Sequence, residues 1–312
     1  MLVTIGRDTP LIGCIAFGII DRGTTLLQIR PTSVCNLNCT FCSVDGGPES
    51  KWHNNFFTVE LDYLVEETEK VIAFKGCDIE INIDSVGEPF CYPHLEELVK
   101  RFRNNQRVKK ISIQTNGMFS KSLDVDVVNL SIHAMDPALA NRLANASCYD
   151  IEKVKSFLQT YLDKKIDVRL CPVWIPGIND EEVPKIIQFA KEKGCSLGIQ
   201  KYETYKYSRK MKAKPLNWYK FYRQIELWEK EFDIQLKLKA KEFEIAKAPR
   251  IPEVFKKGEK VKVEIKQPGW FKDQMIGVAK DRCVSIINCD KKIGDLVNVK
   301  ILETKNNLYI AE

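Results

Sequence analysis

A repeating pattern of short apolar segments and longer amphipathic segments runs from Leu26 to Gln200 of this 312-residue chain. The short segments are rich in β-branched residues and have the length of strands, whereas the longer ones place apolar residues at helical spacing. Six repeats of a strand followed by a helix predict an α/β fold with a parallel sheet. The predicted strands are 26–30, 78–84, 110–114, 127–132, 167–173 and 196–200.

The most distinctive motif is Cys35-Asn36-Leu37-Asn38-Cys39-Thr40-Phe41-Cys42, which follows the first predicted strand. Parallel sheets place their chemistry at the carboxyl ends of the strands, so this position favours a functional site. Soft thiolates this close together suit an iron–sulfur cluster or zinc. Three thiolates leave one iron of a four-iron cluster open to another ligand. A zinc site needs a fourth Cys or His, and the next histidine, His53, follows a Gly-Gly-Pro turn and is a poor candidate.

The cysteine motif resembles the signature of the radical S-adenosylmethionine (radical SAM) enzymes, CxxxCxxC with an aromatic residue before the third cysteine, here Phe41. The resemblance implies a [4Fe-4S] cluster bound by Cys35, Cys39 and Cys42, whose open iron binds SAM. It also implies cleavage of SAM to methionine and a 5′-deoxyadenosyl radical, with an electron from a donor such as ferredoxin or flavodoxin. The implied fold is a six-stranded partial TIM barrel. The alternative is three buried or zinc-binding cysteines.

Two turn motifs after later strands extend the resemblance. Gly87-Glu88-Pro89 follows the second strand, where Gly allows close approach of the backbone and Pro fixes the exit direction. The resemblance implies that this backbone edge receives the SAM amino group, although Val86 stands where the family often has a second Gly. Thr115-Asn116-Gly117 resembles the family motif near the methionyl end of SAM. The alternative for each motif is an ordinary turn between a strand and a helix.

Single residues at strand ends complete the expected SAM site. The resemblance implies contacts of Phe41 with the adenine, Ser131 with the ribose, Arg169 or Asn179 with polar groups, and Ile199 and Gln200 with the adenine. Arg169 is otherwise a surface or structural arginine. Cys171 ends the fifth predicted strand and is a candidate catalytic thiol that carries a methyl group or donates a hydrogen atom; the alternative is a small buried hydrophobe. His133 is either a proton donor, an RNA contact or a structural histidine.

The block 254–312 has a different pattern, with five short β-rich runs separated by turns. These runs predict a small all-β barrel. Gly258, Val261, Val263 and the segments 276–279 and 293–297 resemble a TRAM domain, a small RNA-binding barrel. The alternative is an unrelated small barrel. The predicted strands are 260–265, 275–279, 283–287, 296–303 and 308–311.

Basic and aromatic residues are interleaved from Lys201 to Arg223, where Glu203 is the only acidic residue. Basic residues neutralise phosphates and aromatic rings stack on unpaired bases, so the stretch predicts contact with RNA. The alternative is a solvated connector whose later part is a helix. The core face of that helix is predicted to be Phe221, Ile225, Trp228 and Phe232.

Together these patterns predict an N-terminal β-hairpin extension over 1–25, a radical SAM partial barrel over 26–200, a basic aromatic connector over 201–253 and a TRAM-like barrel over 254–312. Eleven cysteines could indicate a secreted disulfide scaffold, but the chain is long and lysine-rich and starts without a signal peptide pattern. We therefore expect a protein of the reducing cytoplasm with no membrane partner. The net charge of +6 permits a polyanionic partner.

The combined features predict a radical SAM enzyme that modifies RNA, with tRNA as the expected target, by methylation or another carbon-centred change. Radical and TRAM domains together resemble tRNA methylthiotransferases, which carry an N-terminal domain with three more cysteines. Only Cys14 precedes Cys35 here, which argues against sulfur insertion. One alternative is a radical SAM enzyme acting on a protein, peptide or small metabolite. Another is a non-catalytic RNA-binding protein with a structural metal.

Overall fold

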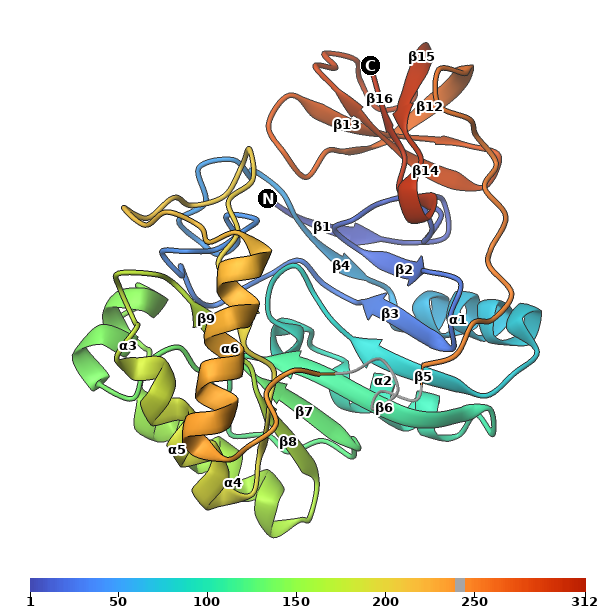
Figure 1. Ribbon diagram of the computed structural model, residues 1–312. Helices are drawn as coiled ribbons and strands as arrows, with labels where there is room; N and C mark the ends of the chain where they lie inside the picture. The colour runs from blue at the N-terminus through green and yellow to red at the C-terminus, as the bar shows by residue number, and fades with distance from the viewer. Residues whose placement is uncertain (239–244) are drawn as a thin grey trace. The chain divides into compact units, whose positions relative to one another are not determined.

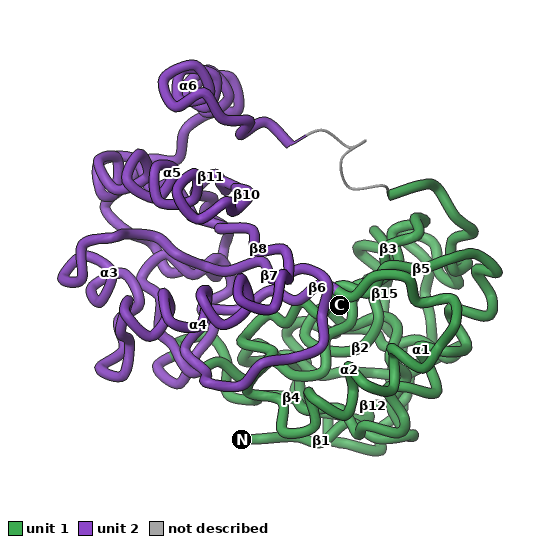
Figure 2. Tube along the Cα trace, turned by 90° about the horizontal axis from the view of Figure 1, so that it is seen from below, with its two compact units in different colours: residues 1–35, 50–111, 245–312 green, residues 36–49, 112–244 purple. Residues whose placement is uncertain are grey.

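The computed structural model describes residues 1–238 and 245–312, and it contains two compact units (Figure 2). Unit 1 comprises Met1–Cys35, Ser50–Ile111 and Ile245–Glu312, and unit 2 comprises Asn36–Glu49 and Ser112–Glu244. The four-part division expected from the sequence stays a prediction, and residues 239–244 of its connector lie outside the described residues.

The sheet of unit 1 begins with a hairpin of β2 (Gly18–Asp21) and β3 (Leu26–Arg30), which pair antiparallel. Strand β3 pairs in parallel with β5 (Ile79–Ile83). Helices α1 (Leu61–Lys75) and α2 (Leu95–Arg103) follow in the expected places (Figure 1). A second, parallel pair of β1 (Leu2–Ile5) and β4 (Phe56–Val59) was not predicted.

Strand β6 (Val108–Thr115) begins in unit 1 and ends in unit 2. In unit 2 it pairs in parallel with β7 (Val127–Leu130), which pairs in parallel with β8 (Asp167–Leu170), followed by β10 (Ser196–Leu197). The complete order is β10-β8-β7-β6-β5-β3-β2. Helices α4 (Ile151–Asp163) and α5 (Glu182–Lys193) lie between consecutive predicted strands, as the repeating pattern predicts. The α/β fold with a partial-barrel sheet is therefore confirmed.

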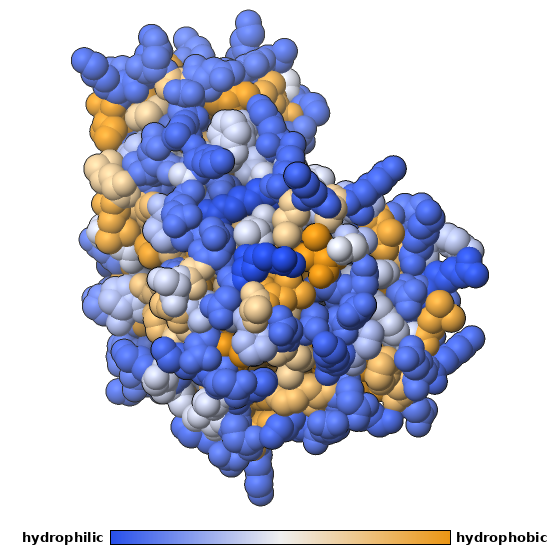
Figure 3. All heavy atoms as spheres, turned by 90° about the vertical axis from the view of Figure 1, so that its left-hand side faces the viewer, coloured by the Kyte–Doolittle hydropathy of each residue, from blue (hydrophilic) through white to orange (hydrophobic). Residues whose placement is uncertain are grey.

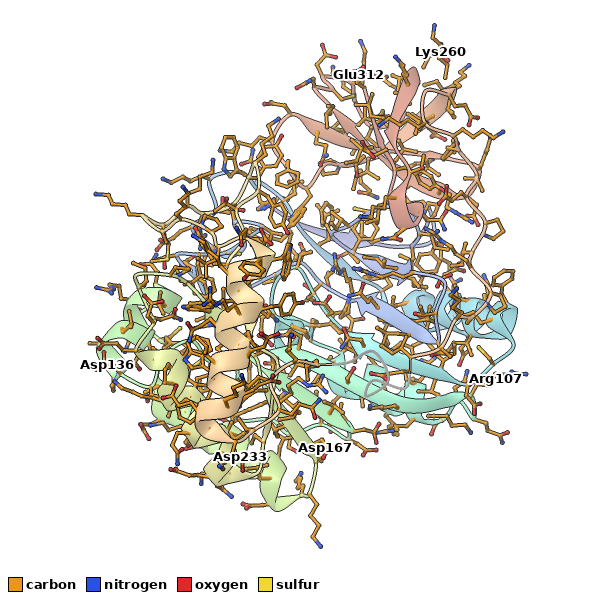
Figure 4. All side chains as sticks on the ribbon, viewed as in Figure 1. Arg107, Asp136, Asp167, Asp233, Lys260 and Glu312 are labelled. Atoms are coloured by element: carbon orange, nitrogen blue, oxygen red, sulfur yellow. The ribbon has the colours of Figure 1, made fainter. Side chains whose placement is uncertain are left out.

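The structure departs from the predicted pattern between β6 and β9. The connection between β6 and β7 contains no helix, so the third predicted strand–helix repeat is wrong. Helix α3 (Pro137–Ala144) was not predicted; Asp136 caps it by accepting a hydrogen bond from the N–H of Leu139 at 2.7 Å (Figure 4). Proline at the first helical position is typical of a helix start. The fifth and sixth strands are each interrupted, and their ends form a separate pair of β9 (Val173–Trp174) and β11 (Gln200–Lys201).

Helix α6 (Trp218–Phe232) begins at Asn217, whose side chain accepts a hydrogen bond from the N–H of Lys220, and ends at Asp233 (Figure 4). Its buried face consists of Phe221, Ile225 and Trp228, as predicted, while Phe232 is half-buried. The rings of Phe221 and Trp228 pack against Trp174 of β9 in the same unit, with centroids 5.9 Å and 4.9 Å away. This face of α6 is thereby packed against the rest of unit 2, and the opposite face of the helix is exposed.

The C-terminal part of unit 1 is a closed barrel, which confirms the predicted small all-β barrel. Its identity as a TRAM domain stays a prediction. Apolar residues alternate along its strands and fill its interior, with Tyr309 fully buried among them. The strands are β12 (Lys260–Pro268), β13 (Gln274–Ala279), β14 (Arg282–Ile287), β15 (Leu296–Glu303) and β16 (Ile310–Ala311).

No helix in the described residues is long and apolar enough to span a membrane. The face of the molecule seen in Figure 3 is mostly hydrophilic, with hydrophobic side chains in scattered patches.

A fully buried ion pair joins three segments of unit 1. The ammonium group of Lys75, at the end of α1, lies 2.8 Å from Oδ1 of Asp21 and also donates to the carbonyls of Thr24 and Pro249 at 2.9 Å and 2.8 Å. Asp21 accepts further hydrogen bonds from the backbone N–H groups of Gly23 and Ile251. Because both charges are buried and hydrogen-bonded, removal of one leaves the other without compensation.

We predict that Lys75→Met lowers the free energy of unfolding by about 3–5 kcal/mol, because the buried Asp21 carboxylate loses its cation. Urea denaturation followed by circular dichroism measures the change. Lys70→Met on the same helix is the control, since the Lys70–Glu67 pair is exposed and its removal should have little effect. Equal, small effects of the two substitutions would contradict the structural role given to the buried pair.

Candidate active site

The three cysteines of the signature lie on a loop that follows β3, and each is half-buried. The N–H of Cys42 donates to the carbonyl of Cys39 at 3.1 Å, so these two residues close a tight turn. The N–H of Gly46 points at Sγ of Cys42 at 3.2 Å. An N–H directed at sulfur stabilises a thiolate, and hydrogen bonds of this kind tune iron–sulfur clusters.

Unit 2 holds the loop from Asn36 onwards through backbone hydrogen bonds. The N–H groups of Asn38 and Thr40 donate to the carbonyls of Ala144 and Leu143 at 3.1 Å and 2.9 Å. These carbonyls belong to the last turn of α3, where helix carbonyls have no partner inside the helix. The unpredicted helix α3 therefore positions the cysteine loop.

The donor set fits a soft metal cluster by its chemistry, with three accessible thiols on one loop and an N–H aimed at one of them. Among the described residues, no group of three His, Cys, Asp or Glu side chains gathers in the arrangement of a metal site. The fit of the three cysteines to a cluster therefore rests on their thiol chemistry, their partial exposure and their position on one loop. Cys35, Cys39 and Cys42 are the residues that would hold a cluster.

The Gly87-Glu88-Pro89 motif follows β5 and lies against the chain just before Cys35, within unit 1. The N–H of Glu88 donates to the carbonyl of Val34 at 2.8 Å. A Cβ on Gly87 would lie 2.1 Å from the Val34 carbonyl oxygen, a distance that real Cβ atoms essentially never show. The Glu88 carboxylate accepts from the N–H of Phe90 and caps the short helix η1 (Pro89–Cys91). Only glycine allows this close backbone approach at position 87.

The Thr115-Asn116-Gly117 motif ends β6 and contacts the residue just after Cys35, within unit 2. The amide Nδ2 of Asn116 donates to Oδ1 of Asn36 at 2.8 Å, and its Oδ1 accepts from the N–H of Met118. Thr115 is buried, and its hydroxyl accepts from the N–H of Gly117. Both turn motifs therefore contact residues next to Cys35. Their roles in binding SAM stay predictions.

Three predicted SAM contacts occupy different places in unit 2. The hydroxyl of Ser131 accepts from Nε2 of Gln114 at 3.1 Å. Arg169 donates to Oδ1 of Asn129, its neighbour in the register of β7 and β8, at 3.3 Å. The side chain of Gln200 is exposed on the separate β9–β11 pair. The assignment of these three residues to SAM stays a prediction.

Phe41 is largely buried, as predicted, and its ring meets that of His133 edge-on with centroids 4.6 Å apart. Burial lowers the pKa of His133 to about 4, so its imidazole is neutral near pH 7. Nδ1 of His133 accepts a hydrogen bond from the N–H of Val173 at 3.1 Å. The Nδ2 group of Asn179 donates to the carbonyls of His133 and Val173, each at 2.9 Å. These contacts favour the structural interpretation of His133.

Cys171 follows β8 and is buried, with its Sγ directed at the carbonyl of Arg169 at 3.6 Å. Burial raises the pKa of the Cys171 thiol to about 12, so the thiol is protonated at neutral pH. A protonated thiol is a poor nucleophile, which disfavours the methyl-carrying role. Donation of a hydrogen atom requires no thiolate, and this role for Cys171 stays a prediction.

The basic and aromatic stretch from Lys201 to Arg223 also holds the cysteine loop. Arg209 donates from its guanidinium to the carboxylate of Asp45 and from its backbone N–H to the carbonyl of Cys42, at 2.6 Å and 2.9 Å. All three residues belong to unit 2. The two charged side chains are 164 positions apart, so no local pattern could have predicted the pair.

Comparisons with known proteins identify the family of the chain and several relatives. Residues 29–190 match the family model of the Radical SAM superfamily. An uncharacterized protein of Methanocaldococcus jannaschii is 35% identical over 99% of this chain and 80% of its own length. The GTP 3′,8-cyclase of Aquifex aeolicus is 27% identical over 59% of this chain, and this chain spans only 58% of that enzyme.

Solved structures share the fold at low sequence identity. Streptococcus suis SuiB bound to S-adenosylmethionine has a TM-score of 0.54 and 18% identity, covering 68% of this chain and 49% of SuiB. A radical SAM methyltransferase from Sphaerobacter thermophilus has a TM-score of 0.53 and 15% identity, covering 69% of this chain and 65% of its own.

We predict that Gly87→Ala weakens SAM binding by about tenfold or more, a loss of over 1.4 kcal/mol, because the added Cβ displaces the backbone from Val34. Equilibrium dialysis of SAM against reconstituted protein measures the affinity. Gly177→Ala is the control, since no atom lies within 4 Å of its added Cβ, and its positive φ of 77° tests whether backbone strain alone weakens binding. An unchanged SAM affinity of Gly87→Ala would remove the role given to this backbone edge.

Proposed function

The chain belongs to the radical SAM superfamily, and from that premise we propose that it modifies RNA, with tRNA as the expected target. Membership makes the protein an enzyme whose cofactors are a [4Fe-4S] cluster and SAM, and it removes the non-catalytic alternative. When bound, the cluster supplies the electron that cleaves SAM to methionine and a 5′-deoxyadenosyl radical. The proposal includes a one-electron donor such as ferredoxin or flavodoxin, and a cytoplasmic location.

The chain's own residues hold and orient these groups. Cys35, Cys39 and Cys42 supply the thiolates, and the backbone of Gly87-Glu88-Pro89 offers polar groups to the SAM amino acid moiety. Phe41 presents an apolar ring beside the cysteines and excludes water. The protein thus contributes position and solvent exclusion, while the radical supplies the reactivity.

The observation that carries the RNA proposal is an aromatic patch on the exposed face of α6, formed by Trp218, Tyr219 and Tyr222. Their side chains are 54%, 73% and 44% exposed, while the opposite face of the helix is buried. The rings of Trp218 and Tyr222 stack with centroids 5.6 Å apart. Exposed rings with this geometry suit stacking of unpaired bases.

Lysines accompany the aromatic patch. The ammonium group of Lys201 lies 5.0 Å from the centre of the Trp218 ring, and that of Lys237 lies 5.6 Å from the centre of Tyr222. Both ammonium groups also pair with carboxylates, Lys201 with Glu203 at 2.7 Å and Lys237 with Glu226. The cations therefore lie against the rings, and the patch favours a stacked base over an apolar peptide as its ligand.

The barrel of unit 1 carries a second basic surface, the outer face of β12 and β15. Lys260, Lys262 and Lys300 are exposed there, and Lys260 points away from the barrel (Figure 4). Lys260 and Lys300 are direct partners in the strand register, and like charges in that relation repel each other. In the described part of the chain, none of the three makes an ion pair. A phosphate backbone would relieve their repulsion, which supports an RNA ligand.

A second candidate substrate is a free nucleotide, favoured by the similarity to GTP 3′,8-cyclases. That similarity covers 59% of this chain, so it leaves much of the chain without a counterpart. A free nucleotide needs no extended basic surface, whereas RNA does. The effects of substitutions in the aromatic patch and on the barrel distinguish the two candidates.

We predict that replacing Trp218 and Tyr222 together by alanine weakens RNA binding about fivefold or more, because each base that stacks on an aromatic ring contributes about 1–3 kcal/mol. Filter binding with unmodified tRNA measures the affinity. The control is Leu227→Ala, which removes a 51% exposed aliphatic side chain from the same helix. Equal affinities of the patch variant and the control would exclude the patch from RNA binding.

For the barrel, we expect the triple substitution of Lys260, Lys262 and Lys300 by glutamine to reduce the salt dependence of RNA binding. The slope of log K against log salt should fall by roughly 0.7–0.9 for each phosphate that the variant no longer neutralises. Lys257→Gln serves as the control, because Lys257 already pairs with Glu303 at 3.3 Å. A salt slope that stays at the wild-type value would show that these lysines bind no phosphate.

A further inference from the structure

A short strap, defined here as Ser208–Met211, crosses the cysteine loop within unit 2. The hydroxyl of Ser208 donates to the carbonyl of Ser43 at 2.9 Å, and the N–H of Arg209 donates to the carbonyl of Cys42 at 2.9 Å. The strap is thus hydrogen-bonded to two consecutive residues at the end of the signature. Neither hydrogen bond depends on the RNA surface described above.

The guanidinium of Arg209 reaches into the loop and binds it at three points. Nε donates to Oδ1 of Asp45 at 2.6 Å, Nη1 to the carbonyl of Cys39 at 3.3 Å, and Nη2 to Oδ1 of Asn38 at 3.4 Å. The Arg209 and Asp45 side chains are only 15% and 2% exposed. An arginine presents its donors from three nitrogens in a fixed planar geometry, whereas a lysine presents all of its donors from one nitrogen.

We propose that Arg209 is a positioning residue for the iron–sulfur cluster. It fixes the carbonyl of one cluster cysteine, Cys39, while its backbone fixes the carbonyl of another, Cys42. It also neutralises Asp45, whose backbone adopts the left-handed φ of 54° that non-glycine residues rarely take. The segment that carries two of the three thiolates is therefore held in shape by a residue from outside the partial barrel.

Arg209 also sets the charge around the cluster. With Arg209 in place, the buried Asp45 carboxylate is compensated. Without it, the buried Asp45 carboxylate loses the guanidinium that lies 2.6 Å away, and added negative charge on the cysteine loop lowers the reduction potential of a cluster. Removal of the arginine should therefore both loosen the loop and make the cluster harder to reduce.

The test uses the anaerobically reconstituted full chain and needs no RNA. The variants are Arg209→Gln, Arg209→Lys and the double variant Arg209→Gln with Asp45→Asn. The control is Arg142→Gln, which removes an equal charge from an exposed residue of α3 in the same unit. Three quantities are measured: the rate of iron loss to a chelator, the midpoint potential from redox titration followed by electron paramagnetic resonance, and the melting temperature of the cluster-free protein.

We expect Arg209→Gln to lose iron at a rate at least about tenfold higher than that of wild type. Removal of a residue that hydrogen-bonds to metal ligands typically has an effect of this size on metal binding. Its midpoint potential should become more negative. The double variant should recover most of the potential because the Asp45 carboxylate is gone, yet still lose iron quickly because the Arg209 guanidinium is gone. Arg209→Lys should keep the potential near that of wild type and still lose iron faster.

Wild-type iron retention and potential in Arg209→Gln would overturn the proposal. If that variant melts before the other measurements are possible, Arg209→Lys carries the test, and wild-type iron retention in Arg209→Lys overturns it. The proposal rests on the family's cluster and not on an RNA substrate. All readouts are made without substrate, so its failure is distinguishable from failure of the RNA proposal.

Discussion

The loop that carries the three cysteines has no regular secondary structure, so its shape depends on hydrogen bonds from other elements. In unit 2, the last carbonyls of α3 receive two of its N–H groups, and Arg209 binds two of its carbonyls. In unit 1, the chain entering the loop is contacted by the backbone of Gly87-Glu88-Pro89. Each contact satisfies a polar group that burial would otherwise leave without a partner. The remaining structure can be understood as the support that brings these partners to the loop.

Sequence patterns predict the parts of this structure that depend on local interactions. The apolar runs at 26–30 and 296–303 predict β3 and β15 with their observed bounds, and the glycine at position 87 is explained by a close backbone approach. The patterns could not predict structure that depends on contacts between residues far apart in the sequence. Asp45 and Arg209 look like ordinary charged loop residues until the fold joins them. Helix α3 was not predicted either, because an Asp-Pro pair begins turns as well as helices and the helix that follows it is short.

The connector after the sheet serves two purposes. Its strap, Ser208–Met211, holds the cysteine loop, and its helix α6 presents stacked rings on its exposed face. A sequence rich in lysine and tyrosine would be expected on any solvated surface, so composition alone could not separate these roles. The distinction comes from burial, since Tyr202 is fully buried with its hydroxyl accepting from Met211, whereas Tyr219 is mostly exposed. Radical chemistry follows from family membership, and the RNA target is the proposal that these exposed rings and the barrel lysines support.

The most direct test of the central claim is the formation of 5′-deoxyadenosine by the reconstituted protein with SAM and a reductant. The assay is run anaerobically with small RNA from an unmodified source, with the same RNA digested by nuclease, and with GTP alone. We predict that intact RNA increases 5′-deoxyadenosine formation and that the digest and GTP do not. Equal formation under all conditions, or an increase with GTP alone, would contradict the RNA proposal while leaving the radical SAM chemistry intact.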